Sequence, residues 1–271
     1  MGFLSLQIGA SVDEDAPATD ADAVAFLTAA GISDPTITEA IVSLAIALKT
    51  AGVWTKLYAL YPFVGGSAST HKWNLIDPQD TDAAFRLTFS GSWTHSATGA
   101  KPDGSTGYAD TKCNIVTEGW TPTNGSAGFY SRTSAKTGGN EYDIGNADGS
   151  DQKASIVIAR YNNDKGYFTH GTSDYVANGT SLDGQGFWAS NRVSGNSEGY
   201  KNGSRIVNQA STCTLESRSL YLGACNRNGA ATYFSAKEHA LTFIGDTLSQ
   251  TEMLDFYSAV QDFQTLLSRN V

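Results

Sequence analysis

Glu141 and Asp143 are the residues whose types and spacing could most directly do chemistry. Two positions apart in a strand, their carboxylates would lie on one face, because side chains alternate between the faces of a strand. Glycoside hydrolysis uses one carboxylate that attacks the sugar and a second carboxyl group about 5 Å away that delivers a proton, and Glu141 with Asp143 could supply the attacking part of such a site. Residues 140–146 are therefore the first candidate for a reaction site.

Two groups of aspartates could supply hard oxygen ligands to a calcium ion at loop tips. The first group is Asp77, Asp80 and Asp82, and the second is Asp143, Asp148 and Asp151. Neither group has the spacing of an EF-hand. The pattern leaves Ca²⁺ binding and solvated turn carboxylates as alternatives, and we expect no other cofactor.

Aromatic residues near predicted turns could bind a glycan. Their rings would cover the apolar faces of sugars while neighbouring polar groups bond the hydroxyls. The candidates are Trp120, Tyr130, Tyr142, Trp188 and Tyr200. For each of them the alternative is a place in the hydrophobic core.

The other reactive side chains form no recognisable catalytic or metal-binding set. The four histidines, His71, His95, His170 and His239, have neither HExxH nor HxH spacing, and no GxSxG elbow is present. The three cysteines, Cys113, Cys213 and Cys225, match neither a zinc ribbon nor a CxxC motif. We expect reduced thiols, with a bridge between Cys213 and Cys225 as the alternative.

The length, composition and charge of the chain limit the classes of protein to which it can belong. A chain of 271 residues with 40% hydrophobic residues can bury one sizeable core. A net charge of -9, with basic residues scattered singly, argues against a nucleic-acid partner. Residues 1–10 lack the positive start of a signal peptide, and Glu39 and Ser43 interrupt the most apolar helix, so no membrane insertion is expected.

Residues 1–57 form the first predicted region, an N-terminal extension with helices. The acidic run that includes Asp13 and Asp22 indicates a solvated linker. A short helix capped by Thr19 or Asp20 should end at Gly31, and a second should start at Asp34-Pro35. The second helix has a wide apolar stripe that must pack on the sandwich, on other copies or on a larger assembly. The residues expected to make this contact are Ile37, Ile41, Leu44 and Leu48.

Residues 58–271 form the second predicted region, an antiparallel β-sandwich or jelly roll followed by a helix. Tight turns are indicated by Asn-Gly or Asp-Gly at residues 103, 124, 148, 178, 183, 202 and 228. Strand-like runs cover residues 85–89, 128–133, 154–161, 186–190, 219–224 and 240–244. Ser249 and Glu252 form a capping box that opens an amphipathic C-terminal helix.

Several stretches of this region resemble the concanavalin and laminin-G-like (LamG) superfamily. They are residues 103–109 (DGSTGYA), 200–206 (YKNGSRI), 220–224 (LYLGA) and 243–252 (FIGDTLSQTE). Each is weak alone, but their order is typical of this jelly-roll fold. The resemblance implies a mainly β sandwich with lectin-like character.

Residues 61–75 (YPFVGGSASTHKWNL), with Asp80 and residues 85–87, resemble structural proteins of tailed bacteriophages. This resemblance implies a virion component such as a head fibre, decoration or tail protein, made in the host cytoplasm. Its implied partners are other virion proteins, further copies of the chain, with a trimer as the expected number, and a host-surface glycan.

Residues 140–146 (NEYDIGN) also resemble the nucleophile strand of sandwich-fold retaining glycosidases. In that pattern a second Glu, two or three residues after the Asp, donates the proton. Here Gly145 or Asn146 takes that place, and neither can donate it. We therefore predict a non-enzymatic virion structural protein, with a carbohydrate-binding adhesion module as the first alternative and a glycoside hydrolase as the second.

Overall fold

The computed structural model describes residues 18–136, 138–180 and 182–271, in which the strands form two sheets. The first, sheet A, has the order β12-β11-β10-β6-β16-β4-β3, and β1 pairs with β16. Neighbouring strands of sheet A are antiparallel. Its strands are β1 (Leu57–Tyr61), β3 (Trp93–Ser96), β4 (Gly99–Pro102), β6 (Ser126–Ser131), β10 (Gly186–Val193), β11 (Asn196–Lys201), β12 (Ser204–Ala210) and β16 (His239–Gly245).

The second, sheet B, has the order β15-β14-β7-β13-β5-β2, and β8 and β9 extend it from β7. Its neighbours are antiparallel except β14 and β7, which run parallel. Its strands are β2 (Thr88–Ser90), β5 (Tyr108–Asn114), β7 (Ile144–Ala147), β8 (Ser155–Ile158), β9 (Tyr167–Thr169), β13 (Ser219–Leu222), β14 (Cys225–Arg227) and β15 (Ala230–Thr232). The predicted mainly β, antiparallel-rich sandwich is confirmed.

Side-chain alternation separates the faces of the sheets. In β10, Trp188 points between the sheets and stacks on Phe168 of β9, with ring centroids 6.1 Å apart. Phe187 points the other way and meets Phe256, with centroids 5.5 Å apart. In β8, Val157 joins the core between the sheets, whereas Ile156 and Ile158 lie on the outer face of sheet B.

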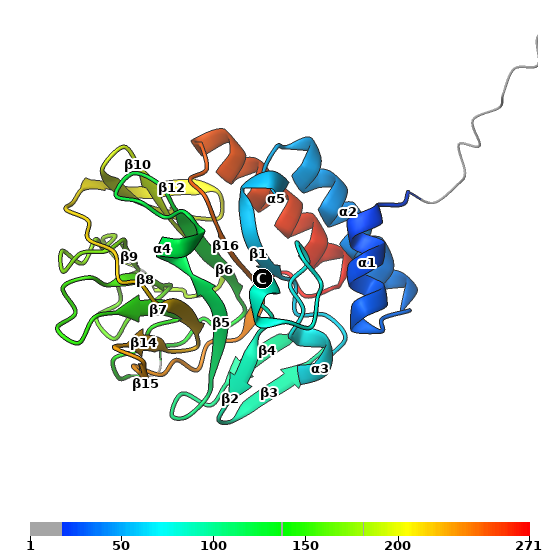
Figure 1. Ribbon diagram of the computed structural model, residues 1–271, viewed down its shortest axis with the longest axis horizontal. Coiled ribbons are helices and arrows are strands. Elements are labelled where there is room, and N and C mark those ends of the chain that lie inside the picture. The colour runs from blue at the N-terminus through cyan, green and yellow to red at the C-terminus, as the bar shows by residue number, and fades with distance from the viewer. Residues whose placement is uncertain (1–17, 137, 181) are drawn as a thin grey trace, which may run out of the picture.

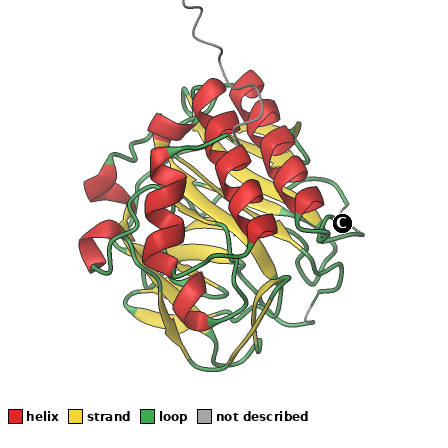
Figure 2. Ribbon diagram, turned by 90° about the vertical axis from the view of Figure 1, so that its right-hand side faces the viewer, coloured by secondary structure: helices red, strands yellow, loops and turns green. Residues whose placement is uncertain are grey.

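Three long helices cover the outer face of sheet A, as Figure 2 shows with the helices in front of the strands. They are α1 (Ala21–Ala30), α2 (Pro35–Thr50) and α5 (Gln250–Leu266). Both ends of α1 and the starts of α2 and α5 follow the predicted signals, which are the Asp20 cap, a left-handed Gly31, the Asp34 cap and the capping box of Ser249 and Glu252. Shorter helical turns are η1 (Trp54–Lys56), α3 (Ala68–His71), η2 (Asp82–Ala84) and α4 (Ile115–Glu118).

The apolar stripe of α2 is covered by the chain itself. Ile41, Leu44 and Leu48 are buried and Ile37 is partly buried, in one hydrophobic cluster with residues of α1, α5 and sheet A. Of the three covers predicted for this stripe, the structure shows packing on the sandwich and its helices, and the assembly role expected of these four residues is corrected. The boundary at residue 57 falls at the start of β1, which pairs with β16, so the same core joins both predicted regions.

The predicted acidic linker is also corrected where the structure describes it. Asp20 caps α1, and both Asp20 and Asp22 lie 2.6 Å from Lys49 Nζ of α2. These ion pairs tie the start of α1 to the end of α2. The remainder of the acidic run, which includes Asp13, lies outside the described residues.

The sequence predicted reduced cysteines and no membrane insertion. Cys113, Cys213 and Cys225 are free thiols, two of them buried and Cys213 half-buried. Among the helices of the described residues, none combines the length and apolar character that a bilayer span requires.

Candidate functional site

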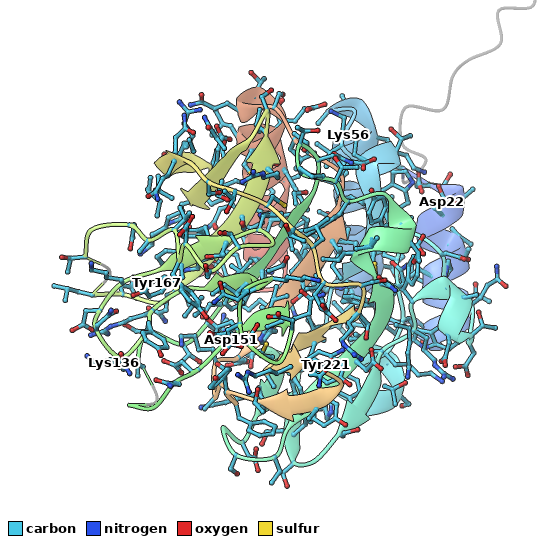
Figure 3. The ribbon with its side chains drawn as sticks, turned by 60° about the vertical axis from the view of Figure 1, so that its left-hand side comes forward. Asp22, Lys56, Lys136, Asp151, Tyr167 and Tyr221 are labelled. Carbon is cyan, nitrogen blue, oxygen red and sulfur yellow. The ribbon has the colours of Figure 1, made fainter. Side chains whose placement is uncertain are left out.

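A pocket of about 310 Å³ opens on the outer face of sheet B. Figure 1 shows that strands β7, β8, β14 and β15 of this sheet lie on the side of the molecule away from helices α1, α2 and α5. Five tyrosines, a carboxylate, an amide and one aliphatic side chain line it. They are Asn140, Tyr142, Asp151, Ile158, Tyr161, Tyr167, Tyr175 and Tyr233. Figure 3 shows Asp151 and Tyr167 near each other on this side of the molecule.

The strands of sheet B position the pocket residues. Alternation in β9 sends Phe168 into the core, so Tyr167 before it points outward. Ile158 at the end of β8 is outward for the same reason, and Tyr161 follows in the next loop. Tyr233 follows β15, and its carbonyl accepts a 2.8 Å bond from the backbone N–H of Tyr142. Segments distant in sequence thus supply the rings.

The tyrosine rings stand at steep angles to one another. The centroids of Tyr161 and Tyr167 are 5.4 Å apart with the planes at 82°, and Tyr175 makes an angle of 89° with Tyr167. Tyr142 and Tyr233 are 4.8 Å apart and tilted by 36°. Edge-to-face packing holds the rings while leaving parts of their faces open to the pocket.

Polar atoms connect the rings. The hydroxyls of Tyr142 and Tyr175 lie 3.1 Å apart, and the hydroxyl of Tyr161 donates a 2.5 Å bond to Asn140 Oδ1. The hydroxyl of Tyr233 donates to Asp151 Oδ2 at 3.4 Å. Tyr175 is the most open of these rings, with 38% of its surface exposed. The pocket therefore combines aromatic surface with fixed hydrogen-bonding groups.

Two pocket residues have left-handed backbones that carry strain. Asp151 has φ 58° and Tyr233 has φ 57°, and a non-glycine residue held there costs about 1–3 kcal/mol. Arg227 of β14 holds the Asp151 loop in place, because its Nε lies 2.7 Å from Asp151 Oδ1 and its Nη2 donates to the Gly149 carbonyl at 2.6 Å. Packing and ion pairing offset the strain and fix the Asp151 carboxylate at the pocket.

Beneath the pocket wall, Glu141, Asp143 and Lys237 are fully buried together. Lys237 Nζ lies 3.0 Å from Glu141 Oε1 and 3.4 Å from Asp143 Oδ1. Both carboxylates face Lys237 in the interior, and they lie in the segment before β7 rather than in the predicted strand. The predicted reaction site at Glu141 and Asp143 is therefore an internal ion cluster without access for a sugar.

This ion cluster joins the segments that carry pocket residues. Asp143 accepts a 2.8 Å bond from the Ala159 amide and a 2.5 Å bond from the Ser235 hydroxyl. Tyr142, Tyr161 and Tyr233 each lie within two residues of a member of this network. The buried charges position the rings rather than act on a ligand.

Of the five aromatic residues predicted to bind a glycan, Tyr142 alone lines the pocket. Trp120 is buried against His170 and donates to the Gly245 carbonyl, and Trp188 donates to the Gly184 carbonyl in the core. Tyr130 lies under the C-terminus, and the buried Tyr200 donates to Glu198. These four predictions are corrected, because a ring in the core cannot cover a sugar.

The structure adds pocket residues that the sequence interpretation missed. They are Asn140, Tyr161, Tyr167, Tyr175 and Tyr233. The available signal was the density of tyrosine, with four between residues 142 and 175. Tyrosine keeps a polar group where phenylalanine would not, which suits a partly open aromatic position.

The aspartates predicted to bind calcium do not gather around a common point. Asp80 pairs with Lys72 and Arg86, and Asp82 pairs with Arg86, while Asp77 accepts from Gln79. Asp143 is in the buried cluster and Asp151 holds Arg227. Asp148 accepts from the amides of its own turn. Within residues 18–136, 138–180 and 182–271, no group of three or more His, Cys, Asp or Glu could hold a metal ion.

The fold and the pocket together define a β-sandwich with an aromatic pocket on the outer face of sheet B. No protein-family model and no curated sequence matches the chain. Among solved structures it is similar to domain 4 of AbnA, a GH43 extracellular arabinanase from Geobacillus stearothermophilus, in complex with arabinotriose. That match has a TM-score of 0.53 and 12% identity and covers 74% of this chain and 98% of the domain.

The chain is also similar to sialidases. A mutant of Trypanosoma rangeli sialidase displaying trans-sialidase activity matches with a TM-score of 0.55 and 11% identity over 82% of this chain and 38% of that one. The T. rangeli sialidase in complex with sialic acid has a TM-score of 0.52 and 10% identity, over 73% and 32%. The chain thus spans about a third of the sialidases, and such identities establish the fold alone.

These comparisons correct one prediction. The prediction of a non-enzymatic protein is wrong, because the solved structures of similar fold include a domain of an arabinanase and sialidases. The absent proton donor at Gly145 or Asn146 concerned one buried pair of carboxylates only.

Proposed function

We propose that this protein binds carbohydrate in the pocket of sheet B. The observation that carries the proposal is the lining itself, in which five tyrosines surround a cavity that also presents Asp151 and Asn140. Small-molecule sites commonly have this character, with apolar and aromatic walls and a few placed polar groups.

Sugars suit both kinds of surface in the pocket. The open faces of Tyr175 and Tyr167 can cover the C–H face of a sugar ring, and the amide of Asn140 and the carboxylate of Asp151 can bond its hydroxyls. The fold likeness supports the proposal, since the arabinanase domain was solved with arabinotriose.

A glycan array followed by calorimetry on the hits would test the proposal. Tyr167→Ala removes a central ring of the pocket and should weaken binding about tenfold or more, since one lost ring contact of about 1.4 kcal/mol gives that factor. The matched control is Tyr108→Ala, because Tyr108 stacks on Tyr221 outside the pocket lining. We expect this control to bind like the wild type.

Two outcomes would overturn the proposal. One is an array on which the folded protein binds no glycan. The other is binding that Tyr108→Ala and Tyr167→Ala reduce equally while thermal denaturation shows both variants folded, since the ligand would then lie elsewhere.

We also propose that the sugar-binding chain is carried on a phage particle as an attachment protein. The support is the resemblance of residues 61–75 to tailed-phage structural proteins. In the structure this stretch supplies core residues such as Tyr61, Phe63 and Leu75. An antibody against the protein should label purified particles, and particles that stay unlabelled would contradict this location.

A further inference from the structure

We infer that the pocket of sheet B selects neutral sugars and rejects sugars that carry a carboxylate or sulfate group. This inference depends on the proposed sugar-binding function and specifies its ligand class. It follows from the charges that line the pocket and from those around it.

No cationic side chain is among the residues that line the pocket, all of which belong to the described part of the chain. Asp151 is the one residue of the lining that is normally ionised near neutral pH. An acidic sugar would therefore meet a carboxylate, and its own charge would lose water without gaining a counter-charge.

Three basic residues near the pocket are already paired with carboxylates, and Lys153 and Lys165, which are close to pocket residues in sequence, are not in its lining. Arg227 is held by Asp151 at 2.7 Å and by the Gly149 carbonyl. Arg160 and Lys136 both pair with Asp164, at 2.9 Å and 3.0 Å. To bind an acidic group, one of these cations would have to leave a carboxylate, so the ligand would gain little.

The tyrosine hydroxyls reinforce this selectivity because they remain neutral. Burial raises the pKa of Tyr142 well above its ordinary range, and it also raises the pKa values of Tyr161, Tyr175 and Tyr233. Neutral hydroxyls both donate and accept hydrogen bonds, which matches the hydroxyl groups of an uncharged sugar.

The test uses an array of paired glycans that differ only in an acidic group, such as lactose and 3′-O-sulfolactose. For each pair that binds, calorimetry measures the neutral and the acidic member. We expect the neutral member to bind about tenfold or more tightly, which corresponds to about 1.4 kcal/mol.

Asp151→Asn sharpens the test because it leaves Arg227 without its carboxylate partner. Asparagine tolerates the left-handed backbone of this position. We expect the preference for the neutral member to fall to about threefold or less. Asp80→Asn is the matched control, since Asp80 is also an ion-paired aspartate, with Lys72 and Arg86 as its partners, but it lies in the loop before β2, and this variant should keep the preference.

Arg227→Met provides an independent arm if Asp151→Asn fails to fold. It leaves Asp151 without its cation and should increase the preference for the neutral member. Equal or stronger binding of acidic members by the wild type, or an unchanged preference in both folded variants, would overturn this inference while sugar binding itself stands. An array without any hit would instead overturn the proposed function.

Discussion

The two outer faces of the sandwich differ in what covers them. Sheet A presents Phe187, Leu241 and Phe243 to three helices, and all three side chains are fully buried. Sheet B presents Ile156 and Ile158 on its outer face, where tyrosines and a 310 Å³ pocket take the place of helices. The strands alternate in the same way in both sheets, so the difference comes from what covers each face.

This comparison separates packing from binding. On sheet A, the ring centroid of Phe256 of α5 lies 4.7 Å from that of Phe243, so the helix covers the surface that a ligand would need. On sheet B, tyrosine rings cover one another only in part, and their hydroxyls reach polar partners. An aromatic residue therefore indicates a binding face only where the structure shows that no helix or strand packs over its ring.

The largest expected effect concerns pH and the buried interior. Burial lowers the pKa values of His71 and His170 to about 3 and that of His239 to about 4. In the unfolded chain each is near 6.5, so the unfolded state binds more protons as pH falls below that value. Stability should be complete above about pH 6.5 and should lose about 2 kcal/mol per histidine by pH 5.

Urea denaturation between pH 8 and pH 5 measures this loss. Sugar affinity should change little over the same range while the protein stays folded, because the pocket lining contains no histidine. A free energy of unfolding that is flat over this range would contradict the neutral buried histidines.

Lys237→Met should destabilise the protein by about 3–5 kcal/mol, because it leaves two buried carboxylates without their cation. Lys136→Met is the control, since Lys136 forms a partly exposed pair with Asp164, and it should cost about 1 kcal/mol or less. Chemical denaturation measures both. If Lys237→Met proved as stable as the control, the ion cluster would not be what holds the pocket segments together.

Leu44→Ala tests the packing of α2 on the helix-covered face of sheet A. It should lower the free energy of unfolding by about 3 kcal/mol, within the range for a buried leucine. Ile46→Ala on the same helix should cost about 1 kcal/mol or less, because Ile46 is 36% exposed. Denaturation at several protein concentrations distinguishes the two possible covers. If the loss in the free energy of unfolding depended on protein concentration, the apolar stripe of α2 would be covered by other copies of the chain and not by α5.

The smallest expected effect is that of Tyr175→Phe on the open face. It keeps the ring but removes the hydroxyl that lies 3.1 Å from the hydroxyl of Tyr142, so stability should change by about 1 kcal/mol or less. Affinity for a neutral glycan should fall about two- to fivefold. Calorimetry measures this change, and an affinity equal to that of the wild type would mean that Tyr175 contributes only its ring.

Much of the fold could be predicted from local signals. Asp34-Pro35 opens α2, Gly31 ends α1, and Ser249 with Glu252 caps α5 as expected. Asn202-Gly203 makes the turn between β11 and β12 with both residues at positive φ. The site was harder to predict, because Trp120 and Tyr142 both lie near turns and differ only in what covers them.

The sequence by itself determined several helix ends, some of the strands and the mainly β class. Caps, turn dipeptides and alternation act over a few residues, and the chain carries them wherever it folds. Only the tertiary structure decided that α5 covers the stripe of α2, that Lys237 neutralises Glu141 and Asp143, and that Tyr233 meets Tyr142. Each of these contacts joins segments about 90 or more residues apart, and such a meeting depends on how the sheets stack and not on any local pattern.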